Sequence, residues 1–297
     1  MEKIIDLHIH TNISDGALSP KEVIDEAVAN GVSVIAIADH DTIEAYNDEL
    51  FEYAEAKNIQ LIKAVEISTK NEKAGIHVLG YNFDINNKEL IDKLYELRNA
   101  RHIYLHDVSE KLRSLGYHIN EEELDKVDAV TKAHIAADVV GTEENKEKLL
   151  SEFGYIPAKG EFIETIMNEG CPAYVKKSTM SPKEAAELIR KAGGKVVLAH
   201  PVAYKNEDNF TEKDIEKIVT DMRSDGIESN YIYINRNNEK INELDIWNEF
   251  AKRHNLFTTI GSDFHNKDGI HPVIGLIGED INLSAEDIDL MLKNILE

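Results

Sequence analysis

The chain has little cysteine, little tryptophan and a shortage of positive charge. Among its 297 residues it has one cysteine, Cys171, and one tryptophan, Trp247. A single cysteine excludes an internal disulfide and is typical of a reducing compartment. Lys and Arg number 33 against 56 Asp and Glu, a formal charge of −23. The negative electrostatic field of such a chain repels long polyanions, so we expect no binding of duplex nucleic acid.

Long apolar runs are also missing. No segment approaches the ~20 apolar residues needed to cross a bilayer, and the first ten residues lack a signal-peptide core. We therefore expect a cytoplasmic protein without a membrane partner. Hydrophobic residues still make up 42% of the chain, which is enough for a sizeable core. Its oligomeric state is not predictable from the sequence.

The first and last parts of the sequence alternate short apolar runs with amphipathic stretches. The periodicity predicts strands at residues 3–10, 32–38 and 59–65, with helices at 19–30 and 42–57. Ser19-Pro20 and Ser181-Pro182 each indicate an N-cap followed by proline at the first helical position. Later helices are expected at 182–192, 212–224, 239–254 and from 285, and strands at 195–199, 227–234 and 256–260.

Between these regions the pattern is charged, amphipathic and without a convincing strand. We therefore predict an α/β domain from residues 1–85 and 171–297, interrupted by a helical insertion at 86–170.

Histidines and carboxylates recur where the predicted strands end. In the first strand, period-two alternation places Asp6, His8 and His10 on one face, so both imidazoles point the same way. In parallel α/β barrels, side chains from several strands converge at the carboxyl ends. The candidate metal ligands at such positions are His8, His10, Asp15, His40, Glu66, His77, His200, Asp263 and His265.

Mixed imidazole and carboxylate ligation suits Zn²⁺, Mn²⁺ or Fe²⁺ and argues against a thiolate-lined structural zinc site. The set is larger than one ion needs. A carboxylate shared by two ions is typical of sites that generate hydroxide and stabilise phosphoryl transfer. Asp39 and Asp41 flank His40 and are candidates for orienting metal-bound imidazoles, although for Asp41 capping of the next helix is an equal alternative.

Five segments resemble the polymerase and histidinol phosphatase (PHP) family. They are DLHIHTNISDGALSPKEVIDEAVANGVSVIAIADHDTI, AVEIS, GIHVLGY, LAHP and GSDFH. The resemblance implies a distorted (β/α)7 barrel with a helical insertion, and two or three divalent ions.

In this arrangement the first ion is held by His8, His10, Glu66 and Asp263. The second is held by Glu66, His77 and His200, and the third by Asp15, His40 and His265. The same resemblance assigns catalysis through a metal-bound hydroxide to His8, Glu66, His200 and Asp263.

The helical insertion is similar to that of a branch containing 3′,5′-nucleoside bisphosphate phosphatases and enzymes that trim RNA from its 5′ end. That branch usually carries Arg-Pro-His-Ile-Ala, where this chain has Lys132-Ala133-His134-Ile135-Ala136. The resemblance implies that Lys132, His134 and Arg236 hold a phosphate that does not react. Lysine offers a point charge where arginine offers a planar two-pronged donor, so the branch's substrate does not transfer directly.

The expected reaction is hydrolysis of a phosphomonoester on a small nucleotide, such as a nucleoside monophosphate or 3′,5′-bisphosphate, or on a similar phosphorylated metabolite. Alternatives are a phosphatase for histidinol phosphate or a sugar phosphate, a short-RNA 5′ exonuclease and a non-catalytic metal-binding module. The full ligand set argues against the last of these.

Overall fold

The computed structural model describes residues 3–127, 130–176, 179–235, 237–278, 281 and 283–297. The chain divides into two compact units. One comprises Met1–Tyr95 with Thr179–Glu297 and is called the sheet unit. The other, Glu96–Ser178, is called the helical unit. In the part of the chain that is described, no helix is long and apolar enough to cross a membrane.

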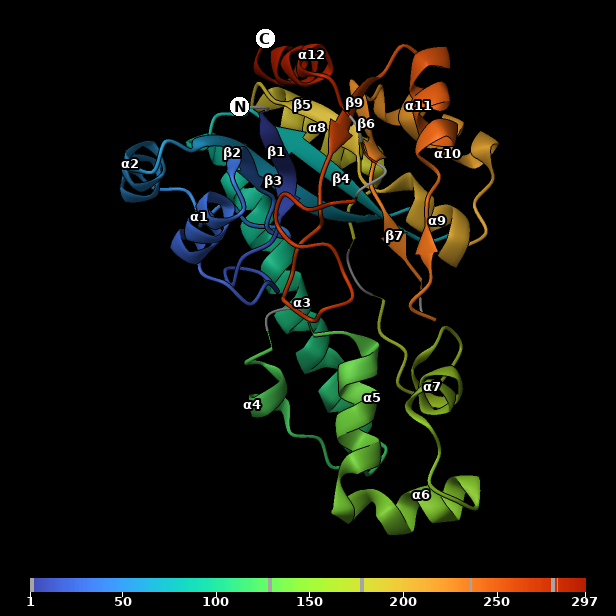
Figure 1. The fold of residues 1–297 in the computed structure, drawn as a ribbon. Coiled ribbons are helices and arrows are strands. Elements are labelled where there is room, and N and C mark those ends of the chain that lie inside the picture. The colour runs from blue at the N-terminus through green and yellow to red at the C-terminus, as the bar shows by residue number, and fades with distance from the viewer. Residues whose placement is uncertain (1–2, 128–129, 177–178, 236, 279–280, 282) are drawn as a thin grey trace. The chain divides into compact units, whose positions relative to one another are not determined.

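The sheet unit is built on seven strands in the order β1-β2-β3-β4-β5-β6-β9 (Figure 1). Most neighbours are parallel, but β4 is antiparallel to both β3 and β5. A small antiparallel ribbon is formed by β7 (Tyr233–Ile234) and β8 (Lys240–Ile241). The seven strands are β1 (Ile4–Ile9), β2 (Val32–Ile37), β3 (Gln60–Lys70), β4 (Gly75–Tyr81), β5 (Lys195–Leu198), β6 (Gly226–Asn230) and β9 (Phe257–Ile260).

The segment that follows β9 returns to β1. Ile9 and Phe264 form an isolated parallel bridge. The Asp263 amide donates to the His8 carbonyl at 2.9 Å, and the His10 amide donates to the Phe264 carbonyl at 2.9 Å. The carboxyl ends of β1 and β9 are therefore held side by side, although they lie at opposite ends of the sheet order.

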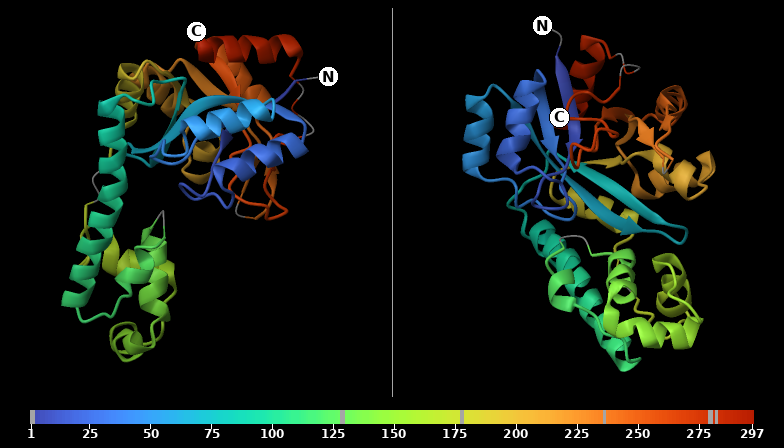
Figure 2. Two further views of the ribbon diagram at one scale, coloured as in Figure 1. Left: turned by 90° about the vertical axis from the view of Figure 1, so that its left-hand side faces the viewer. Right: turned by 60° about the horizontal axis from the view of Figure 1, so that its bottom comes forward.

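Both faces of the sheet are covered. On one face, α1 (Pro20–Ala29) packs against β2 and α2 (Asp48–Ala56) packs against β3, and the two helices lie side by side (Figure 2). On the other, residues such as Leu7 and Val197 form a core to which α12 (Ala285–Leu296) contributes Met291. The remaining helices of the unit are α8 (Pro182–Lys191), α9 (Pro201–Glu207), α10 (Glu212–Met222) and α11 (Leu244–Arg253).

The predicted helix starts at Ser19 and Ser181 are confirmed. Each serine accepts a hydrogen bond from the backbone of the glutamate three residues on, and that glutamate bonds back to the serine amide. These capping boxes satisfy amide groups that a helix start would otherwise leave unpaired.

Several predicted bounds were wrong. The helix expected at residues 42–57 begins only at Asp48, because Asn47 provides the N-cap and Asp41 has a positive φ of 52°. The helix expected from residue 239 begins at Leu244. The strand expected at 227–234 is divided between β6 and β7, and α9 was not predicted at all.

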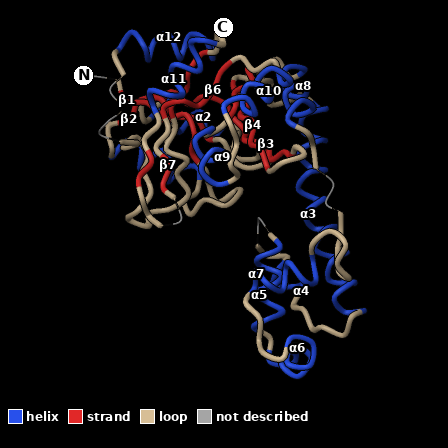
Figure 3. Tube along the Cα trace, turned by 90° about the vertical axis from the view of Figure 1, so that its right-hand side faces the viewer, coloured by secondary structure: helices blue, strands red, loops and turns tan. Residues whose placement is uncertain are grey.

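The helical unit contains helices and loops, with no strand in its described residues (Figure 3). Its core includes Phe162 and Tyr117, whose ring centroids lie 5.2 Å apart. The buried Asn145 side chain donates to the carbonyls of His118 and Val139 and so ties three segments together. The helices that contribute to the helical unit are α3 (Lys88–Ser114), α4 (Glu121–Leu124), α5 (Lys132–Gly141), α6 (Lys146–Phe153) and α7 (Lys159–Phe162), with short helical turns at Glu143–Asn145 and Ile163–Met167.

Candidate metal centre

Candidate ligands from across the sheet unit converge around Glu66. Its Oε2 atom lies 3.2 Å from Nε2 of both His8 and His10. The predicted strand ended before this residue, but β3 continues to Lys70, so Glu66 lies inside a strand and is buried. The other imidazole nitrogens near its carboxylate are His40 Nδ1 at 3.3 Å, His77 Nδ1 at 3.0 Å and His200 Nε2 at 3.1 Å.

A first group consists of His8, His10, Glu66 and Asp263, each offering one atom within 4.8 Å of the others. Nε2 of His8 and Nε2 of His10 are 3.1 Å apart, so the two imidazoles point the same way, as the alternation in β1 predicts. Asp263 Oδ1 completes the group, 3.1 Å from His10 Nε2.

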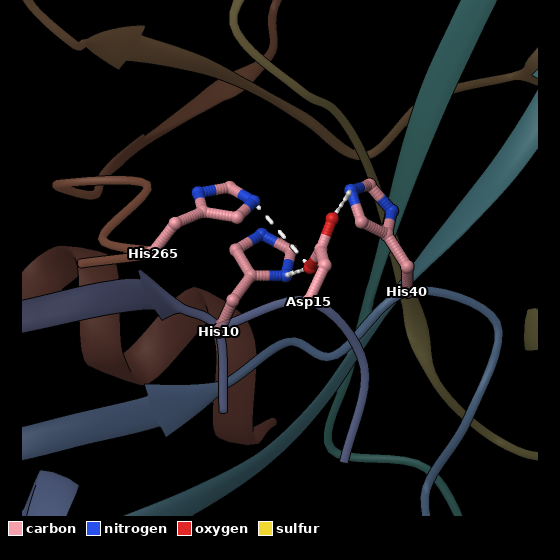
Figure 4. A group of neighbouring side chains, drawn as sticks. All are labelled: His10, Asp15, His40 and His265. Carbon is pink, nitrogen blue, oxygen red and sulfur yellow. Dashed lines mark ion pairs between the residues drawn. The ribbon is translucent and has the colours of Figure 1, made fainter. Parts of the chain in front are cut away.

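A second group surrounds Asp15 (Figure 4). One carboxylate oxygen of Asp15 lies 3.5 Å from His265 Nε2 and 3.6 Å from His10 Nδ1. The other lies 3.8 Å from His40 Nε2. His10 therefore presents Nε2 to the first group and Nδ1 to the second, whereas the resemblance assigned His10 to the first ion alone.

A third group is formed by His40, Glu66 and His77. His200 was expected beside His77, and its Nε2 does lie against Glu66 Oε1, although it is outside the three groups. The structure thus brings all the predicted ligands to one place. The division of these side chains among ions remains a proposal.

The donor atoms fit divalent cations. Glu66 Oε2 and the Nδ1 atoms of His40, His77 and His200 are buried and make no hydrogen bond. Such atoms are costly unless something satisfies them. The separations of 3.0–3.3 Å around Glu66 match adjacent ligands on one ion. Bond lengths of about 2.1 Å place neighbouring ligands about 3.0 Å apart in octahedral and about 3.4 Å apart in tetrahedral geometry.

The acids of the centre are held ionised. Burial opposes this, but His77 and His40 outweigh it and hold the pKa of Glu66 well below its usual range. At His10 burial opposes protonation, yet Asp263 and Glu66 raise its pKa to about 10. At His40 burial prevails, assisted by the neighbouring imidazoles, and lowers the pKa to about 3. Ionised carboxylate and neutral imidazole are the forms that bind metal, so a cation bound beside His10 would displace the proton from its ring.

Two candidate ligands have unusual backbone angles. His200 has φ of 22° and Asp263 has φ of 53°, which are uncommon for residues with a Cβ atom. Strain of this kind persists where surrounding contacts enforce it and is concentrated at functional sites.

Asp39 and Asp41 hold loops. Asp39 accepts hydrogen bonds from the Thr11 amide, the Thr11 hydroxyl and the Ser14 hydroxyl, and so fixes the loop that carries Asp15. Asp41 accepts from the Ser68 amide. The prediction that Asp39 orients an imidazole directly is not supported by these bonds.

Two residues that the sequence interpretation did not place in the site lie directly behind its ligands. Glu228 Oε1 is 3.0 Å from His8 Nδ1. The Tyr231 hydroxyl donates to Asp263 Oδ2 at 3.1 Å, which leaves Oδ1 facing the imidazoles. Glu228 lies on β6 and Tyr231 follows it, and both fall within the strand predicted at residues 227–234, which gave no signal of a role in the site.

The predicted phosphate-binding residues Lys132 and His134 lie at the start of α5. Lys132 Nζ donates to Asn168 Oδ1 at 2.9 Å and lies 6.0 Å from the centroid of the Tyr174 ring. His134 Nδ1 accepts from the Thr131 amide at 3.2 Å, so in the neutral ring Nε2 carries the proton. Arg236 lies outside the described residues.

Known proteins resemble the chain over nearly its full length. The PHP domain matches residues 6–192. A 5′-3′ exoribonuclease of Haemophilus influenzae is 33% identical, covering 89% of this chain and 91% of the relative. A 3′,5′-nucleoside bisphosphate phosphatase of Chromobacterium violaceum is 26% identical, covering 88% and 87%.

A crystal structure described as a metal-dependent phosphoesterase, from Bifidobacterium adolescentis, shares the fold. Its TM-score is 0.67 at 22% identity, covering 99% of this chain and 97% of that one. The chain belongs to the PHP domain family.

Proposed function

We propose that this protein is a metal-dependent phosphatase that hydrolyses a phosphomonoester of a small nucleotide. The observation that carries the proposal is the convergence of imidazoles on the buried Glu66 carboxylate, with donor atoms that lack hydrogen bonds. Both named relatives hydrolyse phosphoester bonds according to their names, and by membership of this family the chain is a hydrolase of such bonds.

Two or three divalent ions, of manganese, zinc or iron, are proposed for the centre. When bound, such ions generate a nucleophilic hydroxide at neutral pH and neutralise the phosphoryl oxygens. The chain's own contribution is the fixed position of four side chains that would hold the ions and that are proposed as catalytic: His8, Glu66, His200 and Asp263. The ionised carboxylates also let a strongly acidic protein accept an anionic substrate, because the cations that they bind reverse the local charge.

Selection among substrates is proposed to depend on the helical unit. Lys132 supplies a cation and His134 an Nε2 hydrogen, both at the first turn of α5. These donors suit a second phosphate, as in a 3′,5′-bisphosphate. The role of Arg236 in the same contact is part of the proposal.

A short-RNA 5′ exonuclease is the second candidate. It is favoured by one observation, the 33% identity with an exoribonuclease against 26% with the bisphosphate phosphatase. A phosphatase for histidinol phosphate or a sugar phosphate has no such support.

One substrate panel separates these activities. It contains a nucleoside 3′,5′-bisphosphate, the matching monophosphate, a 5′-phosphorylated RNA of a few nucleotides and histidinol phosphate. The metal-loaded wild type is compared with Lys132→Ala and His134→Ala. Lys126→Ala is the matched control, because it removes an exposed cation of the same unit that is paired with Glu123.

Loss of a charge-assisted hydrogen bond costs about 1.5–3 kcal/mol, so kcat/KM on the bisphosphate should fall roughly 10- to 150-fold in either variant. The monophosphate should be affected much less, and Lys126→Ala should match the wild type. Equal losses on both substrates would remove the bisphosphate assignment. Faster turnover of the RNA than of either nucleotide would favour the exonuclease.

A further inference from the structure

The Glu228 side chain is a buried carboxylate behind the metal centre. It lies on β6, has no exposed surface and belongs to none of the three groups of close ligands. Each of its oxygens meets a different candidate ligand. Oε1 lies 3.0 Å from Nδ1 of His8, and Oε2 accepts the backbone amide of His200 at 2.9 Å.

The two contacts together suit an ionised carboxylate, which accepts a hydrogen bond at each oxygen. The His200 amide is always a donor, so Oε2 must accept. A carboxylate oxygen 3.0 Å from His8 Nδ1 requires a proton on that nitrogen, since two acceptors would repel one another. In a neutral ring that binds a cation, Nε2 would then be the ligand nitrogen of His8, and it lies 3.2 Å from Glu66 Oε2, a second ligand atom of the same group.

Close packing leaves this arrangement little freedom. A Cβ atom at Gly261 would lie 2.3 Å from the His8 Cβ and 2.6 Å from Glu228 Oε1. The absence of a side chain at Gly261 therefore allows β1, which carries His8, and the Glu228 carboxylate to approach closely. On the other side, the strained backbone of His200, with φ of 22°, is held by the bond to Glu228 Oε2.

We propose that Glu228 is a positioning residue for the metal centre: it sets the His8 tautomer through one oxygen and holds the His200 backbone through the other. The inference rests on the proposed metal-dependent function and deepens it. Partners behind metal-binding histidines typically change metal affinity 10- to 100-fold when they are lost.

Glu228→Gln tests the proposal with almost no change of shape. Glutamine has one acceptor oxygen, whereas His8 Nδ1–H and the His200 amide are two donors. If the oxygen serves His200, the amide group faces His8 and favours the tautomer with hydrogen on Nε2. If it serves His8, the His200 amide loses its partner. Either orientation should weaken Mn²⁺ or Zn²⁺ binding.

Ser229→Ala is the matched control. Ser229 is the next residue of the same strand, is 2% exposed, and donates to Asn248 rather than to a candidate ligand. Affinity for Zn²⁺ is measured without substrate, by competition with a chelator of known affinity. We expect a 10- to 100-fold loss for Glu228→Gln and less than a twofold change for Ser229→Ala.

The outcomes separate this inference from the proposed function. If the wild type binds no divalent ion, the proposed function fails. If it binds ions and Glu228→Gln binds them equally well, the positioning role is overturned, even when the variant melts at a lower temperature. Should Glu228→Gln not fold, long-range proton–nitrogen NMR of the zinc-loaded wild type decides. A His8 ring protonated on Nδ1 supports the proposal, and one protonated on Nε2 overturns it.

Discussion

Thermal stability should depend on divalent cations through Glu66. The Glu66 carboxylate lies within 3.3 Å of nitrogen atoms from five imidazoles, which come from β1, β4 and the segments after β1, β2 and β5. An ion bound among these groups ties distant segments of the folded chain together and has no equivalent site in the unfolded chain. Present at 100 times its dissociation constant, it stabilises the fold by about 2.7 kcal/mol. With an unfolding entropy of about 2.1 cal/mol/K per residue over 297 residues, that is an increase in Tm of about 4 °C.

Replacing Glu66 by glutamine keeps the shape but turns one oxygen into an amide donor and removes the charge. Melting is followed by calorimetry after chelation and again with Mn²⁺ or Zn²⁺ restored. Wild type should gain several degrees, and Glu66→Gln should lose most of that gain. Glu49→Gln is the control, because this exposed glutamate pairs only with Lys21 among the contacts described. The reasoning would be refuted if the Tm of the wild type did not change when the cation is restored. It would also be refuted if the Tm of Glu66→Gln rose as much as that of the wild type.

Three further outcomes are expected. Phe162→Ala, which empties a fully buried position, should destabilise the helical unit by about 3–5 kcal/mol without changing the metal stoichiometry, measured by elemental analysis. Because Glu121 raises the pKa of His106, Glu121→Gln should lower the His106 pKa in an NMR titration. In the wild type the ion pair stabilises the fold below pH ~6.5, and this stabilisation is lost as the pH rises through the pKa of His106. With a net charge of −23, affinity for duplex DNA at physiological salt should be weaker than the ~10⁻⁴–10⁻⁶ M of non-specific binders, and micromolar binding in a gel-shift assay would contradict the expectation.

The candidate ligands at the ends of β1, β2, β5 and β9 were predictable because a simple rule places them, whereas Glu66 lies inside β3 and His77 lies on the antiparallel β4. Strand alternation directs His8 and His10 to the same side, and the carboxyl ends of parallel strands meet at one edge of a sheet. A residue type that recurs at those ends is therefore brought together by the topology alone. The capping boxes at Ser19 and Ser181 follow from local sequence in the same way.

The segment at residues 42–47 shows where local pattern fails. Its apolar spacing resembles that of a helix, but the Tyr46 hydroxyl donates to the Ile37 carbonyl at 2.5 Å and accepts from the Ala64 amide at 2.8 Å. These bonds hold the segment against β2 and β3, and the helix starts only after Asn47. Such partners are set by the tertiary fold, which propensity does not describe.

The support behind the ligands could not be predicted for a related reason. Glu228 and His8 are 220 positions apart in sequence, and β6 is not a hydrogen-bonded neighbour of β1 in the sheet. Their contact depends on the return of the segment after β9 to β1 and on the absence of a side chain at Gly261. Identifying ligands requires only residue type and strand position, whereas orienting them requires packing to within a few tenths of an ångström. The contact of His8 Nδ1 with Glu228 and the Tyr231 bond that leaves Asp263 Oδ1 facing the imidazoles belong to this second kind of information. Variants of Glu228 and Tyr231 should therefore affect metal affinity, while variants of Lys132 should affect the choice of substrate.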